Sequence, residues 1–196
     1  MFQVRIHGRG GQGVVTATEL LSMAAFEEGR HAQAFPSFGS ERTGAPVVAF
    51  CRIADGPIRV RESVVVPDAV VVQDATLLHQ VDVFQRLGPS AYVLINSLRT
   101  FEDLGLGDIV ASQLPERLAT VPATELALEH LGRAVPNAAL LGGFAALTRM
   151  VSITAVVAAI RERFSPTLAT GNAAAASAAY DLVSLRMKEY SDAQTG

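Results

Sequence analysis

Cysteine is nearly absent from this chain, which has 196 residues and a single thiol at Cys51. One cysteine excludes an intrachain disulfide, a zinc site with several thiolates and an iron–sulfur cluster ligated only by cysteines of this chain. Cys51 lies within the apolar run Val47–Ile53, which resembles a buried strand. We therefore predict an inert core thiol there rather than a nucleophile.

Basic runs and long apolar runs are also missing. The chain carries 16 lysine and arginine residues against 19 aspartate and glutamate residues, for a formal net charge of −3. This balance gives no support for nucleic-acid binding. No apolar stretch reaches the roughly 20 residues of a membrane span, and the N-terminus lacks the cationic-then-apolar pattern of a secretory signal. We expect a cytoplasmic protein without a membrane span.

Recognisable catalytic and metal-binding patterns are absent as well. The four histidines are scattered without metal-ligand spacing, at His7, His31, His79 and His130. No Gly-x-Ser-x-Gly elbow or other nucleophile arrangement occurs. His7 adjoins a glycine-rich segment and could touch a ligand, although a hydrogen-bonded histidine at a strand end is the favoured interpretation. Asn172 is expected to cap the N-terminus of a helix.

Apolar residues, in contrast, are abundant. They make up 49% of the chain, charged residues make up 18%, and the mean hydropathy is +0.30. This is apolar for a soluble monomer of this size, so we expect partners to cover part of the surface. The length predicts one domain that spans residues 1–196.

A glycine-rich segment near the N-terminus carries the clearest motif. Gly8, Gly10 and Gly13 have the spacing of the dinucleotide-binding fingerprint, between an expected strand, Phe2–His7, and an expected helix, Val14–Glu28. Such a loop favours phosphate, because glycines allow close backbone approach and the helix start offers unpaired N–H groups. The same glycines could instead serve only close strand–helix packing.

An NAD site would need an acidic residue at the end of the second strand to bind the ribose. That strand, His31–Phe35, is followed by Pro36 and Ser37 and has no acid there. The long polar loop beyond it contains Ser40, Glu41 and Arg42. In that loop the arginine could pair with a phosphate or carboxylate while Glu41 orients it, or the two could form an exposed ion pair.

The remaining segments predict a three-layer, Rossmann-like α/β domain with a mostly parallel sheet, an inserted β-hairpin and a helical C-terminal third. The hairpin is expected from Val47–Ile53 and Ile58–Val66, which flank a turn. The other expected elements are the strands Asp68–Gln73, Ala91–Asn96 and Leu118–Pro122 and the helices Ala75–Leu87, Thr124–Arg133, Leu140–Met150, Ile153–Phe164 and Ala173–Tyr190.

Two long motifs resemble one known family. Ile6–Ala17, which reads IHGRGGQGVVTA, and Ala34–Pro46, which reads AFPSFGSERTGAP, are similar to signatures of the gamma subunit of 2-oxoacid:ferredoxin oxidoreductases. Asn137 and the pair Gly142-Gly143 also fit this family, as does the apolar segment before Asn96. Thr43 and Ala45 depart from the family pattern, which often has arginine or glycine there.

The resemblance implies a subunit, inactive alone, of a complex that oxidatively decarboxylates a 2-oxoacid, transfers the acyl group to coenzyme A and passes electrons to ferredoxin or a similar acceptor. It implies partner subunits of the alpha, beta and ferredoxin-like delta types, which hold thiamine diphosphate, Mg²⁺ and [4Fe-4S] clusters. The 2-oxoacid stays open between pyruvate, branched-chain and aryl acids such as phenylglyoxylate.

This chain would then help to form the coenzyme A site and the subunit interface. The residues expected to contact coenzyme A are Gly8, Arg9, Gly10, Gly11, Gln12, Gly13, Ser40, Glu41 and Arg42. The N–H groups of Gly10, Gly11 and Gly13 would hold its diphosphate, and Arg9 or Arg42 would face its 3′-phosphate. Two other hypotheses are a subunit that only bridges its partners and a free-standing NAD- or flavin-binding oxidoreductase.

Overall fold

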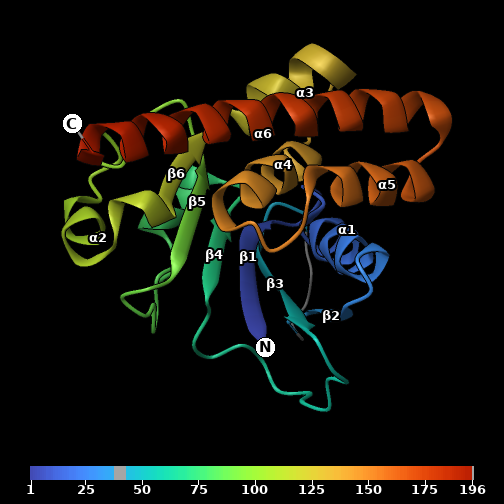
Figure 1. Ribbon diagram of the computed structural model, residues 1–196, viewed down its shortest axis with the longest axis horizontal. Coiled ribbons are helices and arrows are strands. Elements are labelled where there is room, and N and C mark those ends of the chain that lie inside the picture. The colour runs from blue at the N-terminus through green and yellow to red at the C-terminus, as the bar shows by residue number, and fades with distance from the viewer. Residues whose placement is uncertain (38–42, 196) are drawn as a thin grey trace.

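The computed structural model describes residues 1–37 and 43–195 and has a six-stranded sheet with helices packed beside it (Figure 1). The strands are β1 (Phe2–Arg9), β2 (His31–Pro36), β3 (Pro46–Ala54), β4 (Ala69–Val72), β5 (Tyr92–Asn96) and β6 (Leu118–Val121). The helices are α1 (Val14–Glu27), α2 (Gly107–Ser112), α3 (Ala123–Leu131), α4 (Asn137–Thr148), α5 (Ile153–Arg163) and α6 (Pro166–Thr195). The predicted α/β class is confirmed.

The sheet has the strand order β2-β3-β1-β4-β5-β6. Four neighbouring strands, β1, β4, β5 and β6, run parallel, as their continuous apolar sequences predict. β3 runs antiparallel to both β1 and β2. The sheet is therefore mostly parallel, and its one reversed strand lies directly beside the strand that leads into the glycine loop.

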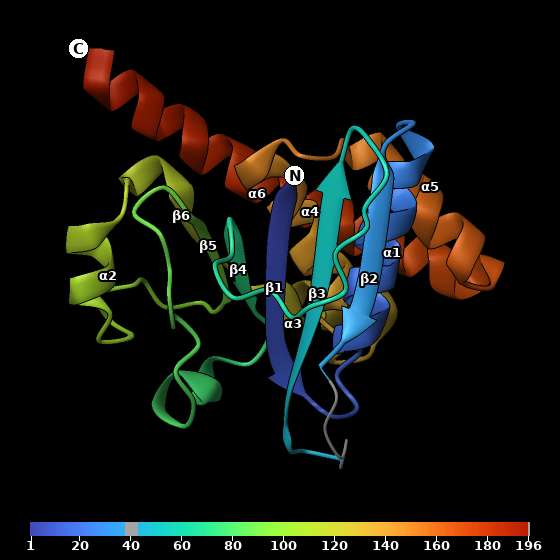
Figure 2. The ribbon, with the colours of Figure 1, turned by 90° about the horizontal axis from the view of Figure 1, so that it is seen from below.

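The two faces of the sheet are covered differently. Alternation along β1 directs Val4 and Ile6 into the core beneath the long helices, and Arg5 and His7 toward the opposite face. α1, α4, α5 and α6 lie behind the strands in Figure 2. Among the described residues, the facing side carries the short helix α2, the 3₁₀ turn Ala75–His79 and irregular segments, one of which, 55–68, runs in front of β3 (Figure 2).

An antiparallel hairpin is present, but it is formed by β2 and β3 and not by the predicted pairing of Val47–Ile53 with Ile58–Val66. β3 pairs with β2, from His31 opposite Ala54 to Pro36 opposite Ala49, whereas Ile58–Val66 forms no strand. The physical reason is that β1 and β2 already occupy both edges of β3, so no ladder position is left for a third partner. Residues 58–66 instead lie mostly exposed.

The helix predicted over Ala75–Leu87 is also wrong, because only the 3₁₀ turn Ala75–His79 forms. Beyond it, the guanidinium of Arg5 donates to the main-chain carbonyls of Val83 and Gln85, at 3.0 and 2.7 Å. Arg86 then adopts a left-handed conformation with φ of 55°. A side chain on the neighbouring strand thus satisfies carbonyls that a helix would have paired internally.

The C-terminal helices pack closely; α4 and α6 begin earlier than predicted, whereas α5 begins at Ile153 as predicted. α6 runs from Pro166, so Asn172 lies inside it, buried, and donates to the carbonyl of Leu168 at 2.8 Å; the predicted cap at Asn172 is wrong. A Cβ on Gly142 of α4 would lie 1.8 Å from the carbonyl oxygen of Ala176, so this glycine permits the α4–α6 contact. Among the described helices, none is long and apolar enough to cross a membrane.

Candidate functional site

A polar crevice lies where β1, β4 and β5 end at their carboxyl edges. Its cavity measures about 250 Å³ and is lined by Gln12, Gln73, Asp74, Ala75, Asn96, Thr124, Ala134 and Pro136. The chain leaves β1 toward α1 on one face of the sheet and leaves β4 toward the 3₁₀ turn on the other. Adjacent strands whose connections diverge in this way form the switch point at which open α/β sheets bind ligands.

The glycines of the loop between β1 and α1 serve different physical needs. A Cβ on Gly8 would lie 2.5 Å from Cγ2 of Val14, and one on Gly13 would lie 2.7 Å from Nδ2 of Asn137. These two positions are therefore fixed by close packing. Gly11 has φ of 92°, and among the described residues a methyl group placed on it would meet only Thr43, at 3.9 Å. Gly11 is the glycine that leaves room for a bound group.

The main-chain hydrogen bonds of the loop decide which N–H groups are available. The N–H of Gly10 donates to the carbonyl of Ala45 at 2.9 Å, and the N–H of Gly44 donates back to Gly10 at 3.0 Å. Gly10 is thus engaged, contrary to the expectation that its N–H faces a phosphate. The N–H groups of Gly11, Gly13 and Val14 have no hydrogen-bond partner among the described residues.

Arg9 and Gln12 are held by a hydrogen-bonded network centred on Asp74. Nε of Arg9 and Nε2 of Gln12 donate to the same carboxylate oxygen of Asp74, at 3.0 and 2.9 Å. The remaining guanidinium bonds go to the carbonyl of Gly44 and to the side chains of Thr76 and Gln80. Oε1 of Gln12 accepts from the N–H of Arg9 at 2.8 Å. These contacts fix the shape of the loop and give Arg9 a positioning role.

Asp74 stays ionised in this network. Burial alone would raise the pKa of its carboxyl group, but hydrogen bonds from Thr76 and Gln12, together with the charge of Arg9, outweigh burial and hold the pKa below its ordinary value. Asp74 was not predicted as a site residue, because an acid was expected only after the second strand. Its signal was present, since Gln73 and Asp74 come directly after the continuous apolar strand β4.

Two further polar side chains line the crevice and were not predicted as site residues. Gln73 is 1% exposed, and its Oε1 is buried without a hydrogen-bond partner. Asn96 joins two strand ends, because its Nδ2 donates to the carbonyl of Gln73 at 2.8 Å and its Oδ1 accepts from the N–H of Thr124 at 3.1 Å. Gln73 therefore lines the crevice and has a buried acceptor that no described residue uses.

The second predicted motif is only partly visible. Ser40, Glu41 and Arg42 lie outside the described residues. Its flanks are placed beside the glycine loop, since Thr43 forms a β-bridge with Gly10 and Ala45 accepts the N–H of Gly10. The two motifs therefore lie side by side at these flanking residues.

Two other candidate side chains, Cys51 and His7, are buried. Cys51 is fully buried, and burial raises the pKa of its thiol to about 12, which confirms the predicted inert thiol. His7 is 5% exposed, but neither ring nitrogen has a hydrogen-bond partner among the described residues, which contradicts the predicted hydrogen-bonded histidine. Within residues 1–37 and 43–195, no cluster of three or more His, Cys, Asp or Glu side chains could hold a metal ion.

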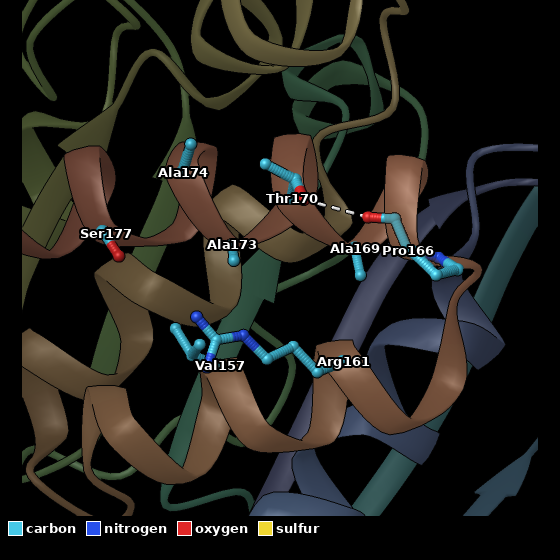
Figure 3. Close-up of a pocket in the computed structure, with 8 residues that line it drawn as sticks. All are labelled: Val157, Arg161, Pro166, Ala169, Thr170, Ala173, Ala174 and Ser177. Carbon is cyan, nitrogen blue, oxygen red and sulfur yellow. Dashed lines mark hydrogen bonds between the residues drawn. The ribbon is translucent and has the colours of Figure 1, made fainter.

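A larger groove, of about 530 Å³, lies between α5 and α6 (Figure 3). Val157 and Arg161 come from α5, and the other side chains drawn in Figure 3 come from α6 and are mostly small. The hydroxyl of Thr170 donates a hydrogen bond to the carbonyl of Pro166 at 2.9 Å. Arg161 is the one ionisable side chain among those that line this groove, which gives it little chemistry compared with the crevice.

Comparisons with known proteins agree over nearly the whole chain. A family model described as pyruvate ferredoxin/flavodoxin oxidoreductase matches residues 3–182. Pyruvate synthase subunit PorC of Methanothermobacter marburgensis is 47% identical over 181 residues, which cover 92% of this chain and 97% of that protein. The common gamma subunit of the pyruvate/ketoisovalerate oxidoreductases of Thermococcus kodakarensis is 46% identical over 181 residues, 92% of this chain and 96% of that protein. The crystal structure of pyruvate oxidoreductase subunit PORC from Thermotoga maritima has a TM-score of 0.76 at 34% identity, covering 92% of this chain and 95% of that one.

Proposed function

The chain belongs to the pyruvate ferredoxin/flavodoxin oxidoreductase family, and we propose that its glycine loop contacts coenzyme A in the assembled enzyme. It is a gamma-type subunit of a pyruvate/2-oxoacid:ferredoxin oxidoreductase complex. The observation that supports coenzyme A contact is that the N–H groups of Gly11, Gly13 and Val14, at the start of α1, have no partner within the part of the chain that the structure describes. A diphosphate would accept hydrogen bonds from such groups and interact favourably with the helix dipole.

The remaining polar groups of the loop suit a positioning role. The guanidinium of Arg9 already donates to Asp74, Gly44, Thr76 and Gln80, so its hydrogen bonds are spent on the loop itself. The charge for the 3′-phosphate is then assigned to Arg42, on the segment whose flank at Thr43 pairs with Gly10. In this proposal Asp74 shapes the loop and Arg42 recognises the ligand.

The redox cofactors of the reaction are assigned to partner subunits of the alpha, beta and ferredoxin-like delta types. The cysteine-ligated clusters of this chemistry need several thiolates, and the single cysteine of this chain is buried in β3. Among the described residues, no three or more His, Cys, Asp or Glu side chains form a group that could hold a metal ion. A single buried thiol does not fit a cluster ligated by several cysteines, and no step through the redox cofactors is assigned to this chain.

Selection of the 2-oxoacid is likewise assigned to the partners. The relative from Thermococcus kodakarensis is named as a subunit common to pyruvate and ketoisovalerate oxidoreductases, and a shared subunit does not select between their substrates. The crevice of this chain is small and polar, and two of the strand ends that form it are joined by the hydrogen bond from Asn96 to the carbonyl of Gln73. We propose that this subunit serves more than one 2-oxoacid in the same way.

Two alternatives compete with coenzyme A contact. A free-standing NAD enzyme is disfavoured, because β2 ends without an acid and the carboxylate of Asp74 is already engaged by Arg9, Gln12 and Thr76. A purely bridging subunit would use the same apolar composition without binding any ligand. A subunit that contacts coenzyme A and a subunit that only bridges its partners predict different effects of a Gly11 substitution on coenzyme A binding.

The test is Gly11→Val in the assembled complex. A branched side chain at this exposed position would block the approach of a phosphate to the neighbouring N–H groups. We expect the KM for coenzyme A to rise about tenfold or more, which is the loss of roughly one charge-assisted hydrogen bond. The half-reaction that reduces the clusters with a 2-oxoacid should proceed at its normal rate without coenzyme A.

The matched control is Gly29→Val, at the other end of α1. Gly29 also has a positive φ, 74°, and also faces open space, so it imposes a similar backbone strain away from the loop. This variant should keep the wild-type KM for coenzyme A. If the Gly11→Val complex bound coenzyme A as tightly as the Gly29→Val complex, the chain would be a bridging subunit and the proposal would be overturned.

A further inference from the structure

A second cavity lies on the sheet face that lacks long helices. It measures about 330 Å³, and its lining includes Arg5 and His7 of β1, Phe50 of β3, Ser63, Asp82 and Arg86. Alternation along β1 directs Arg5 and His7 to this same face. The two side chains are 6% and 5% exposed, so each is more than nine-tenths buried.

His7 contributes to this lining, and both of its ring nitrogens are buried without a hydrogen-bond partner among residues 1–37 and 43–195. Burial and the neighbouring charge of Arg5 lower the pKa of His7 to about 3, so the imidazole is neutral at physiological pH. A neutral imidazole carries one N–H donor and one acceptor. Unpaired buried polar atoms are rare in folded proteins, and each one costs about 1–3 kcal/mol unless a partner is present.

Arg5 adds a second unused donor that is held in a fixed place. One terminal nitrogen of its guanidinium donates to the carbonyls of Val83 and Gln85, while its buried Nε has no partner. The side chain is therefore anchored at its tip and keeps an N–H free along its edge. A donor fixed in this way loses little conformational entropy when a ligand binds.

The charges around the cavity favour an anion. Arg5 and Arg86 are cationic, Asp82 is anionic and His7 is neutral, which leaves a net positive charge on the lining. The volume equals that of about ten water molecules in the liquid, which is enough for a carboxylate or a phosphate together with a few waters. Both groups offer oxygens that accept from guanidinium and imidazole N–H groups.

We propose that this cavity binds a small oxyanion, a carboxylate or an inorganic phosphate, through Nε–H of Arg5 and the imidazole N–H of His7. The site does not depend on coenzyme A contact at the glycine loop, and a failure of either proposal leaves the other standing. The experiments that test this site therefore contain no coenzyme A. Asp82 at the rim limits the charge that the site accepts, which favours a small anion of low charge over a polyphosphate.

The test uses the full chain with sodium acetate or sodium phosphate, against sodium chloride at equal ionic strength. At ten times the dissociation constant, the bound anion should raise the midpoint of thermal unfolding by about 3–5 °C over chloride. The two anions are separate arms, so the larger shift identifies the preferred one. In parallel, the imidazole ¹⁵N resonances of His7 should move as the anion is added, which reports on the wild-type chain directly.

His7→Phe keeps the ring volume and removes both nitrogens, so it should abolish the extra stabilisation by the anion. His7→Gln keeps one donor and one acceptor and should restore part of it. The matched control is His31→Phe, at an exposed histidine on β2, which should respond like the wild type. Equal anion effects in the wild type and in His7→Phe, with unmoved His7 resonances, would overturn the proposal and leave the cavity to water.

Discussion

Arg9 and His7 lie two residues apart on β1, yet their side chains differ sharply in hydrogen bonding. The guanidinium of Arg9 donates to four different residues, whereas neither ring nitrogen of His7 has a partner in the described part of the chain. The difference arises from the segments that surround each side chain. The chain leaves β4 through Asp74, which reaches Arg9, while the strand face beside His7 is covered by irregular segments that bring it no partner.

The comparison separates two uses of polar residues in one strand. A network of matched donors and acceptors, such as the one around Asp74, holds a loop in one shape because its members bond to one another. Unmatched donors in a cavity are instead available to something that the chain does not supply. Arg9 and its partners are thus expected to affect coenzyme A only through the geometry of the loop. His7 and Arg5 are expected to contact a small anion directly.

Gly8, between the two residues, gives the largest expected effect. The Gly8→Ala variant places a methyl group 2.5 Å from Cγ2 of Val14, so β1 and α1 must move apart. Overpacking of this kind costs up to about 3 kcal/mol of unfolding free energy. Chemical denaturation of the variant measures this loss, and the displaced loop should also break the bond between Arg9 and Asp74.

The matched control is Gly56→Ala, where a methyl group meets nothing within 4 Å and no positive φ is involved. Its unfolding free energy should equal that of the wild type. A Gly8→Ala protein as stable as Gly56→Ala would mean that the first glycine of the motif is not a packing requirement.

Asp74→Ala gives the next largest effect, because it removes the carboxylate that accepts hydrogen bonds from Arg9 and Gln12. Arg9 and Gln12 would both lose an acceptor while remaining partly buried. Leaving such donors unmatched costs about 2 kcal/mol of unfolding free energy. In the assembled complex the loosened loop should raise the KM for coenzyme A without lowering the rate of cluster reduction.

Asp55→Ala is the control for this change. It also breaks an aspartate–arginine pair, with Arg30 at 3.3 Å, but the carboxylate of Asp55 is 94% exposed. Exposed ion pairs contribute little, so the midpoint of thermal unfolding should stay within about 1 °C of the wild type. If Asp74→Ala were equally harmless, the network would not hold the loop.

Sequence patterns predicted the parts of this fold whose causes are local. The apolar runs of β1, β4, β5 and β6 and the glycine motif before α1 are legible because each element is encoded by neighbouring residues. The glycine motif likewise marked the crevice. Burial of Cys51 followed from the apolar run that contains it.

The errors concern features with long-range causes. Residues 58–66 have strand-like composition, but whether they pair depends on β1 and β2 having taken both edges of β3. The segment after His79 unwinds where Arg5, almost 80 positions earlier, captures the carbonyls of Val83 and Gln85. Arg9 has the charge of a phosphate ligand, but in the fold it is engaged by Asp74. Spacing along the chain does not specify which acceptor a donor meets in space.

His7→Phe gives the smallest effect, and it tests the unpaired half of the comparison by pH. Burial, followed by the charge of Arg5, lowers the pKa of His7 from 6.5 to about 3. Between these values the unfolded chain binds a proton that the folded chain excludes, so stability is retained above pH 6.5 and is lost as the pH falls below it. At pH 5.5 the loss amounts to about 1.4 kcal/mol. Phenylalanine does not titrate, so the unfolding free energy of the variant should fall less between pH 7.5 and pH 5.5 by this amount. Denaturant titrations at the two pH values measure the difference, and parallel pH profiles would show that His7 protonates as easily in the folded chain as in the unfolded one.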